Sequence, residues 1–174
     1  MEAGFSMSKH DEVVLSKTIR QAFAHRARPT SLSGFSQLSQ MELMDLVTFS
    51  GFEWDNVDAD MWEKHFDMIS LLSPEAFCYY LPGICTASLL EKRPDLIVVS
   101  AVIGMLDRTP TPEWWDDFFL ERWPQLTAPE CEAVQQWVWW LTTLPGTSHS
   151  EESLMRALHT LELLSNQMAQ PKAS

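Results

Sequence analysis

Signals that start helices recur along the whole chain, and they constrain the fold more than any other feature of the sequence. A serine or threonine followed three residues later by an acid can satisfy two free amides of a first helical turn. A proline directly after the cap also suits that turn. We therefore predict an all-α fold, a single irregular or orthogonal bundle of about seven helices. The predicted starts are Ser8, Ser39, Asp58, Ser73, Thr111, Thr127 and Ser148.

One domain is expected from the length. The chain has 174 residues, of which 45% are apolar and 21% charged, values typical of a globular domain with one core. The prediction is a helical domain over residues 1–170 with a frayed tail over 171–174. The secondary structure of residues 95–106 is not decided by the sequence, because their β-branched run could form a helix or a strand. No second strand pattern is present to pair with it.

The charge narrows the classes of partner. There are 24 acidic and 12 basic residues, for a formal net charge of −12. Direct nucleic-acid binding and attachment to an anionic membrane need clustered bases, so both are disfavoured. An acidic surface attracts a basic protein instead. The longest apolar run, at 96–106, is also too short to span a bilayer.

Three cysteines, Cys78, Cys85 and Cys131, indicate a reducing compartment. Their odd number and the absence of a CxxC pair disfavour a disulfide framework or a zinc site. The acidic run at 55–60 lacks the central glycine and the final glutamate of an EF-hand loop, and Asp58 is better explained as a helix cap. The first residues lack an apolar core of signal-peptide length. We expect a cytoplasmic protein without a cofactor or a bound metal.

Residues 71–83 read LLSPEAFCYYLPG and set aromatic side chains between two prolines. The pattern predicts a helix start, followed by a kink or restart at Pro82, because proline has no amide hydrogen to donate. The favoured interpretation is a packed core, and the alternative keeps Tyr79 exposed as a binding anchor. The structural signature of this stretch consists of Ser73, Pro74, Phe77, Tyr80 and Pro82.

Tryptophan is frequent, with eight in the chain. Trp114 and Trp115 are adjacent, as are Trp139 and Trp140, and adjacent helical positions point about 100° apart. One member of each pair should therefore face outward or into a groove. Exposed tryptophan is typical of protein-binding sites, although a wide, packed apolar face is the other explanation.

Acidic residues gather in two stretches. Residues 42–67 hold eight acids against Lys64 alone, and residues 107–132 hold seven against two arginines. A solvated surface explains any one of them, but together they could form one field that captures a basic protein. The candidate partner-binding residues are Glu53, Asp55, Asp58, Asp60, Trp115, Asp116 and Asp117.

No complete catalytic constellation is present. The five histidines are scattered, and the sequence has no HExxH, GxSxG, Walker or GxGxxG pattern. We therefore predict that the protein is not an enzyme. An enzyme of unrecognised type is the alternative, with Cys85 or His65 as its candidate residue, and a Cys–His or carboxylate pair in a pocket would favour it.

The run LSPEAFCYYLPGICTASL at 72–89 resembles the signature of a family of small uncharacterised bacterial proteins, whose mark is a Ser-Pro-Glu-Ala-Phe-x-Tyr-Tyr-Leu-Pro core. Ile19, Ala22-Phe23 and residues 51–54 are similar as well, so the resemblance spans residues 15–90. Members of this family resemble the acidic immunity or accessory proteins that accompany bacterial toxins. Cys78 stands at the variable position of the signature, so the resemblance implies no role for it.

The sequence hypothesis is therefore an immunity-type protein. It would bind a cognate toxin, a basic protein, and cover its active site with an acidic, tryptophan-bearing helical surface. A nucleic-acid mimic that inhibits a nuclease complex is one alternative, and it would need acids in rows at phosphate-like spacing. A scaffold or homo-oligomer subunit is another. A monomer and a small homo-oligomer both fit the sequence.

Overall fold

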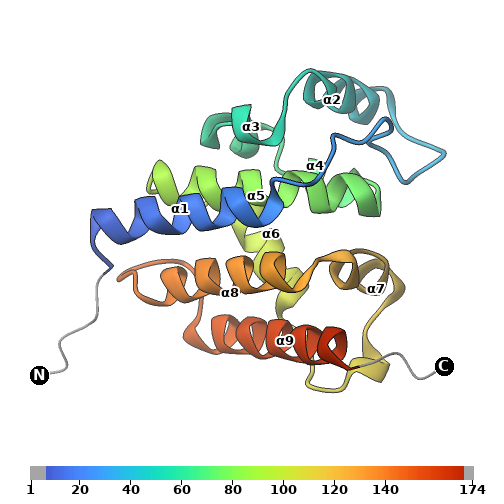
Figure 1. Ribbon diagram of the computed structural model, residues 1–174. Helices are drawn as coiled ribbons and strands as arrows, with labels where there is room; N and C mark the ends of the chain where they lie inside the picture. Colours follow the sequence, from blue (N-terminus) through green and yellow to red (C-terminus); the bar gives the residue numbers. More distant parts are fainter. Residues whose placement is uncertain (1–6, 171–174) are drawn as a thin grey trace, which may run out of the picture.

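The computed structural model describes residues 7–170, which are built from helices (Figure 1). Within that range there are nine α-helices and three 3-10 turns, and the β-pairing is limited to an isolated bridge between Ser33 and Leu72. The predicted all-α bundle of about seven helices is confirmed. The tail predicted at 171–174 lies outside the described residues. In chain order the elements are α1 (Lys9–Phe23), α2 (Gln40–Ser50), η1 (Trp54–Asn56), α3 (Ala59–Lys64), α4 (Met68–Leu71), α5 (Pro74–Leu90), α6 (Ile97–Leu106), η2 (Pro112–Trp114), α7 (Asp117–Arg122), η3 (Trp123–Gln125), α8 (Ala128–Thr142) and α9 (Glu151–Ala169).

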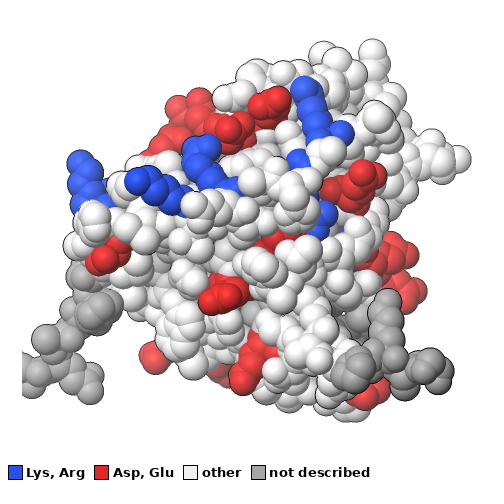
Figure 2. Space-filling model, viewed as in Figure 1, with Lys and Arg blue, Asp and Glu red and all other residues white. Residues whose placement is uncertain are grey.

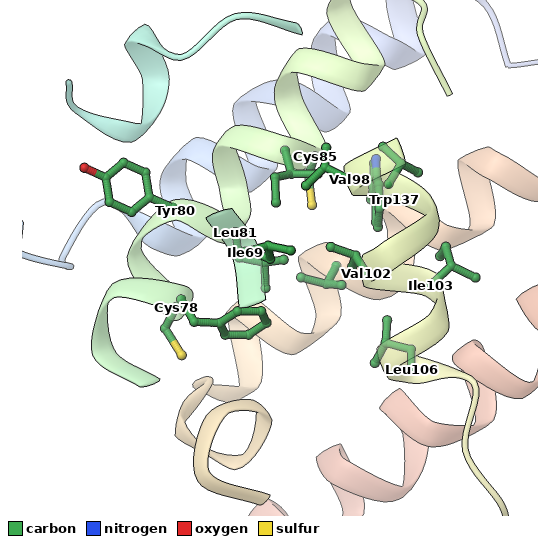
Figure 3. Close-up of a cluster of buried hydrophobic side chains, with 14 of the residues drawn as sticks. Ile69, Cys78, Tyr80, Leu81, Cys85, Val98, Val102, Ile103, Leu106 and Trp137 are labelled. Carbon is green, nitrogen blue, oxygen red and sulfur yellow. The ribbon is translucent and has the colours of Figure 1, made fainter. Parts of the chain in front are cut away.

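Helix α5 lies at the centre of the molecule. Every residue from Ala76 to Leu89 is buried, and α5 packs against α1, α6, α7 and α8. Figure 1 shows α1 running along α5, with α8 and α9 stacked beneath them. In Figure 3, Leu81 and Cys85 of α5 lie beside Val98 and Val102 of α6, while Tyr80 points away from this cluster. Two faces of α5 therefore serve two different sets of neighbours.

Five of the seven predicted helix starts are capped as expected. The other two predictions are wrong, because Thr111 makes no side-chain cap and α9 is capped by Ser150 and not by Ser148. The hydroxyls of Ser8, Ser39 and Thr127 each accept a hydrogen bond from the amide three residues on, and the carboxylate at that position accepts one from the amide of the cap residue. The hydroxyl of Ser73 accepts from the amide of Ala76 at 3.1 Å and starts α5. These local signals fix where the long helices begin.

The apolar segment at 95–106 forms a helix, α6. Val98, Val99, Val102 and Leu106 are buried and recur at helical spacing, against α5 and α9. This burial outweighs the weaker helix propensity of β-branched residues. No helix within residues 7–170 is long and apolar enough to cross a membrane.

The kink or restart predicted at Pro82 is not observed as a break, because α5 runs on from Pro74 to Leu90. Proline removes one backbone hydrogen bond and leaves the rest of the ladder available. Packing of both halves in the core keeps them in one helix, since tertiary burial supplies most of a helix's stability. The hydroxyl of Thr86 also donates to the carbonyl oxygen of Pro82 at 2.9 Å.

The third predicted helix is wrong in its extent. After the start at Asp58, the helical spacing of Trp62, Phe66 and Ile69 predicts one continuous helix. In the structure α3 ends at Lys64 and α4 begins at Met68. Between them His65 has φ −118° and ψ 40°, outside the helical region. Its ring is held by Asp45 of α2, so a tertiary contact ends the helix, and Phe66 is left exposed.

From the start at Thr111 the sequence predicts a helix that runs to about Arg122, and the observed helix is shorter. Residues 112–114 form the 3-10 turn η2, and Trp115 is extended, with φ −73° and ψ 138°. This geometry buries the Trp115 indole, whose Nε1 donates to the carbonyl oxygen of Thr109 at 3.0 Å. Asp116 then caps the real helix, α7, by accepting from the amide of Phe119 at 2.9 Å.

Candidate protein-binding surface

The aromatic residues of the signature stretch belong to the core, as the favoured interpretation predicted. Phe77 and Tyr80 are fully buried, and Tyr79 is 5% exposed. The Phe77 ring packs edge-on against Trp123, with centroids 5.2 Å apart. The hydroxyl of Tyr80 lies 2.8 Å from the carbonyl oxygen of Phe52. These side chains therefore position other elements and offer no exposed anchor to a partner.

The outer side of α2 is apolar and exposed, a feature that the sequence pattern did not identify. Met41 is 77% exposed, Met44 64% and Val47 71%, at spacings of three residues. Leu43, 51% exposed, lies one turn before Val47. We refer to these four side chains as the α2 stripe. Exposed apolar side chains that adjoin one another on a single helix are typical of an interaction surface.

The inner side of α2 is firmly packed. Leu46 and Phe49 are buried, and the Phe49 ring lies 5.0 Å from the Trp62 ring. Asp45 Oδ1 lies 3.0 Å from Nδ1 of His65, whose ring packs edge-on against Phe49. The α2 stripe is thus displayed on a helix that is fixed at several points.

An acidic ridge follows α2 directly in the chain. It consists of Glu53, Asp55, Asp58 and Asp60, all exposed, on η1 and α3. Asp55 pairs with Arg20 at 3.4 Å and Asp60 with Arg93 at 2.5 Å. Figure 2 shows acidic side chains gathered at the upper left, where α3 lies in Figure 1, with basic side chains below and to the right of them, and a surface without charged side chains further to the upper right.

Asp58 has the capping role that the sequence predicted. Its carboxylate accepts from the amide of Met61 at 2.8 Å and starts α3. Cap and ridge functions are compatible, because the residue is still exposed to solvent. Glu63, a half-buried acid three residues after the ridge, is used within the fold, where it accepts from the amide of Ile97 at 3.1 Å.

The second group of candidate residues needs correction. Trp115 is 5% exposed and cannot serve as a surface anchor, whereas its neighbour Trp114 is 76% exposed. Asp116 caps α7 and pairs with Arg108, and the amide of Phe119 is the main reason that the pKa of the Asp116 carboxyl is lowered.

Asp117 is exposed but lies in α7, away from the acidic ridge on η1 and α3. Figure 1 places α3 and α7 on opposite sides of the molecule. The structure therefore does not bring the two predicted groups together into one surface.

The expected split of the tryptophan pairs is observed on α8 as well. Trp137 and Trp140 are buried and Trp139 is 51% exposed. Trp139 borders a shallow hollow of about 370 Å³ between α1 and α8, whose other apolar walls are Met7, Val14 and Leu15. This hollow lies apart from the ridge, on the side of α1 that faces α8.

The cysteines are held as buried thiols. Burial raises the pKa of Cys78 to about 12, and it also raises the pKa of Cys85 and Cys131. His65, the other candidate for catalysis, is bonded to Asp45 and not to a thiol. Among residues 7–170 no group of three His, Cys, Asp or Glu side chains could hold a metal ion. The thiolate needed for nucleophilic chemistry is therefore disfavoured at all three sites.

Two buried acids were not singled out from the sequence. Glu130 is fully buried and accepts from Arg26 at 2.5 and 2.7 Å, which ties the end of α1 to the start of α8. Glu12 accepts from Lys92 at 2.6 Å and from the Trp140 indole at 3.2 Å. Glu130 belongs to a capping box, which was the available signal, but the arginine partner is distant in sequence.

A scan against protein-family models, a search of the curated proteins and a search of the solved structures each gave no match. The class of this protein rests on its structure: an all-α bundle that displays an apolar helix face and an acidic ridge in consecutive segments, 40–50 and 53–60. The arrangement has the parts of a protein interface, an apolar centre with a charged rim.

Proposed function

We propose that this chain is an immunity-type protein that binds a cognate bacterial toxin and neutralises it by covering the toxin's active site. The observation that carries the proposal is the surface formed by residues 29–63. This segment contains seven acids and no lysine or arginine, and it carries the exposed α2 stripe and the exposed acidic ridge on consecutive stretches of the chain.

Electrostatic steering is the first part of the mechanism. The seven acids of residues 29–63 are more than a quarter of the chain's 24, and a local excess of one sign raises the rate of encounter with the opposite sign. The ridge pairs Arg20–Asp55 and Arg93–Asp60 lie at the surface. Such pairs contribute only about 0–1 kcal/mol each, so a basic partner can replace them.

Occlusion is the second part. A preformed helical surface pays little conformational entropy on binding, and α2 is held by Phe49, Tyr80 and His65. A toxin that acts on an anionic substrate carries bases around its active site, and the ridge complements such a site. Neutralisation then requires no chemistry from this chain.

The alternatives are less well supported. Cys85 is fully buried with a raised pKa, which disfavours it as a nucleophile. Nucleic-acid mimicry needs an uninterrupted row of acids, but Arg20 and Arg93 pair with two of the four ridge acids.

Growth tests the proposal. The protein encoded next to this chain is expressed alone and together with it. The expected result is growth arrest by the neighbour alone and restored growth on co-expression. A neighbour that does not arrest growth, or an arrest that persists on co-expression, would contradict the proposal.

Two triple variants then test the ridge in the same assay. Replacing Glu53→Gln, Asp55→Asn and Asp60→Asn should weaken the rescue, because steering is reduced. The control variant carries Glu132→Gln, Glu151→Gln and Glu162→Gln, exposed acids of α8 and α9. It removes the same charge and should rescue growth fully.

A further inference from the structure

We infer that the α2 stripe is the apolar centre of the interface and inserts into an apolar groove of the partner that is bordered by basic side chains. The inference rests on the proposed function in taking the partner to be a basic protein. It goes further in assigning the binding mode and in moving the centre of the interface from the ridge to α2.

The spacing of the stripe fits a helix that enters a groove. Met41, Met44 and Val47 follow one another at three-residue steps, and Leu43 broadens the same side of the helix. Helices recognised in grooves use anchors at such steps. Two of the four side chains are methionines, whose flexible thioethers adapt to irregular apolar surfaces.

The exposure of the stripe is not a consequence of loose packing. The opposite side of α2 buries Leu46 and Phe49, and a capping box from Ser39 to Glu42 fixes its first turn. Tyr80 and His65 hold its second half through hydrogen bonds. A helix with two apolar sides, one packed and one open, indicates a second packing partner.

Charge distinguishes the kind of partner. Glu42 and Asp45 are the charged residues of α2, and the acidic ridge begins three residues after its end. If a second copy of this chain bound here through the same surface, its residues 29–63 would bring seven acids and no lysine or arginine against the same seven acids. Like charges facing each other oppose association. A groove with a basic border has the complementary charge.

Cross-linking in cells tests this inference. The photoreactive residue p-benzoylphenylalanine replaces Met44 of the full chain, and in a control it replaces Met155, which is 47% exposed on α9. The expected result is one basic protein joined at position 44 and not at 155. Cross-linking of a second copy at 44, or of no protein at 44, would overturn the inference.

The protein that the cross-link identifies is then purified, and the kinetics of its binding to this chain complete the test. The double variant Met44→Gln/Val47→Gln keeps the charge, so it should raise the dissociation rate roughly tenfold or more with little change in association. The ridge variant should instead slow association, and more so at low salt. Met155→Gln should change neither rate. Equal binding by wild type and the double variant would count against the α2 stripe.

The two proposals fail in different ways. Restored growth without a cross-link at position 44 leaves the immunity function standing and removes α2 from the interface. A basic partner that joins at 44 and is released by Met44→Gln/Val47→Gln, but does not arrest growth, supports the binding mode and contradicts toxin neutralisation.

Discussion

The hydroxyl of Tyr80 lies 2.8 Å from the carbonyl oxygen of Phe52 and 3.1 Å from that of Phe49, so the central helix α5 holds the end of α2 directly. A hydroxyl has one hydrogen to donate, and here two carbonyl groups share it. The aromatic stretch between Pro74 and Pro82 thus links the core of the protein to the helix that carries its exposed apolar stripe.

Tyr80→Phe should loosen α2 without disturbing the rest of the core. The ring stays, but the carbonyl oxygen of Phe52 loses its donor, at a cost of about 1–3 kcal/mol in the free energy of unfolding. Urea denaturation measures that loss. Hydrogen exchange provides the internal control, because amides of α2 should exchange faster while those of α9 keep their protection. Unchanged exchange in α2 would show that the hydroxyl does not hold it.

Gly83→Ala and Gly104→Ala form a matched pair, because the first should lower the stability of the fold and the second should raise it. A Cβ at position 83 would lie 2.5 Å from the carbonyl oxygen of Trp54, a backbone atom of η1, whereas one at position 104 meets nothing within 4 Å. Overpacking of this kind costs about 1–3 kcal/mol. Gly104→Ala should gain roughly 0.5–1 kcal/mol from helix propensity. Thermal unfolding of both variants compares them, and equal midpoints would contradict the close approach of η1 to α5.

Local signals explain how much of the fold could be predicted. Ser39 and Glu42 form a capping box with each other, so a stretch of four residues was enough to place the start of α2. The breaks at His65 and Trp115 depend instead on Asp45 and on the carbonyl oxygen of Thr109. The Asp45 contact joins residues 20 positions apart, and the Trp115 indole is buried by the packing of the whole bundle. A pattern of neighbouring residues does not contain such information.

The candidate site was predicted only in part, for a related reason. Acids such as Glu53 and Asp60 are exposed, as charged residues usually are. Leu43 and Val47 recur with Leu46 and Phe49 at helical spacing, and a sequence does not reveal which of two apolar sides a helix buries. The same ambiguity applies to Trp114 and Trp115. One of the two was expected to be exposed, but the sequence analysis assigned the interface to Trp115, which is the buried one.

Asp116→Ala should destabilise the protein more than Asp117→Ala. Asp116 caps α7 through the amide of Phe119, and losing a cap costs about 1 kcal/mol. The lowered pKa of Asp116 gives this contribution a pH dependence. It is fully present above the ordinary value of 3.8 and is lost as the pH falls through that value and then through the lower folded one.

The measurement is urea denaturation of wild type and both variants between pH 7 and pH 3. The difference between wild type and Asp116→Ala should shrink towards pH 3, while Asp117→Ala stays close to wild type throughout. A gap for Asp116→Ala that is constant with pH would show that the ionised carboxylate is not the capping group.

The thiols should resist alkylation in the folded protein. The pKa of Cys78 is raised from 9.0 to about 12, a difference of three units that leaves about a thousandfold less thiolate at pH 8. Iodoacetamide at pH 8 should therefore label Cys78, Cys85 and Cys131 rapidly in urea and very slowly without it. Rapid labelling of any of them in the folded state would reopen the case for a reactive cysteine.

The same shift predicts the response to alkali. A thiol whose folded pKa is raised ionises first in the unfolded chain, so the unfolded state then binds fewer protons and stability falls as the pH rises. For Cys78 the loss should begin near pH 9 and continue towards pH 12. Cys78→Ala removes this part of the slope, which urea denaturation at pH 8 and pH 10 measures against wild type.

Glu130→Gln should be among the most damaging single changes outside the aromatic core. Glu130 is fully buried and is paired with Arg26 through two hydrogen bonds of 2.5 and 2.7 Å. Breaking a buried pair by removing one charge costs about 3–5 kcal/mol, because the other charge is left uncompensated. Glu132→Gln, an exposed change on the same helix, should stay within about 0.5 kcal/mol of wild type.

The double variant Arg26→Met/Glu130→Met should be more stable than Glu130→Gln, because it leaves no unpaired charge. Urea denaturation ranks the variants, and a double variant that is the least stable of the three would mean that the ion pair itself, and not the penalty of an orphaned arginine, holds α1 to α8.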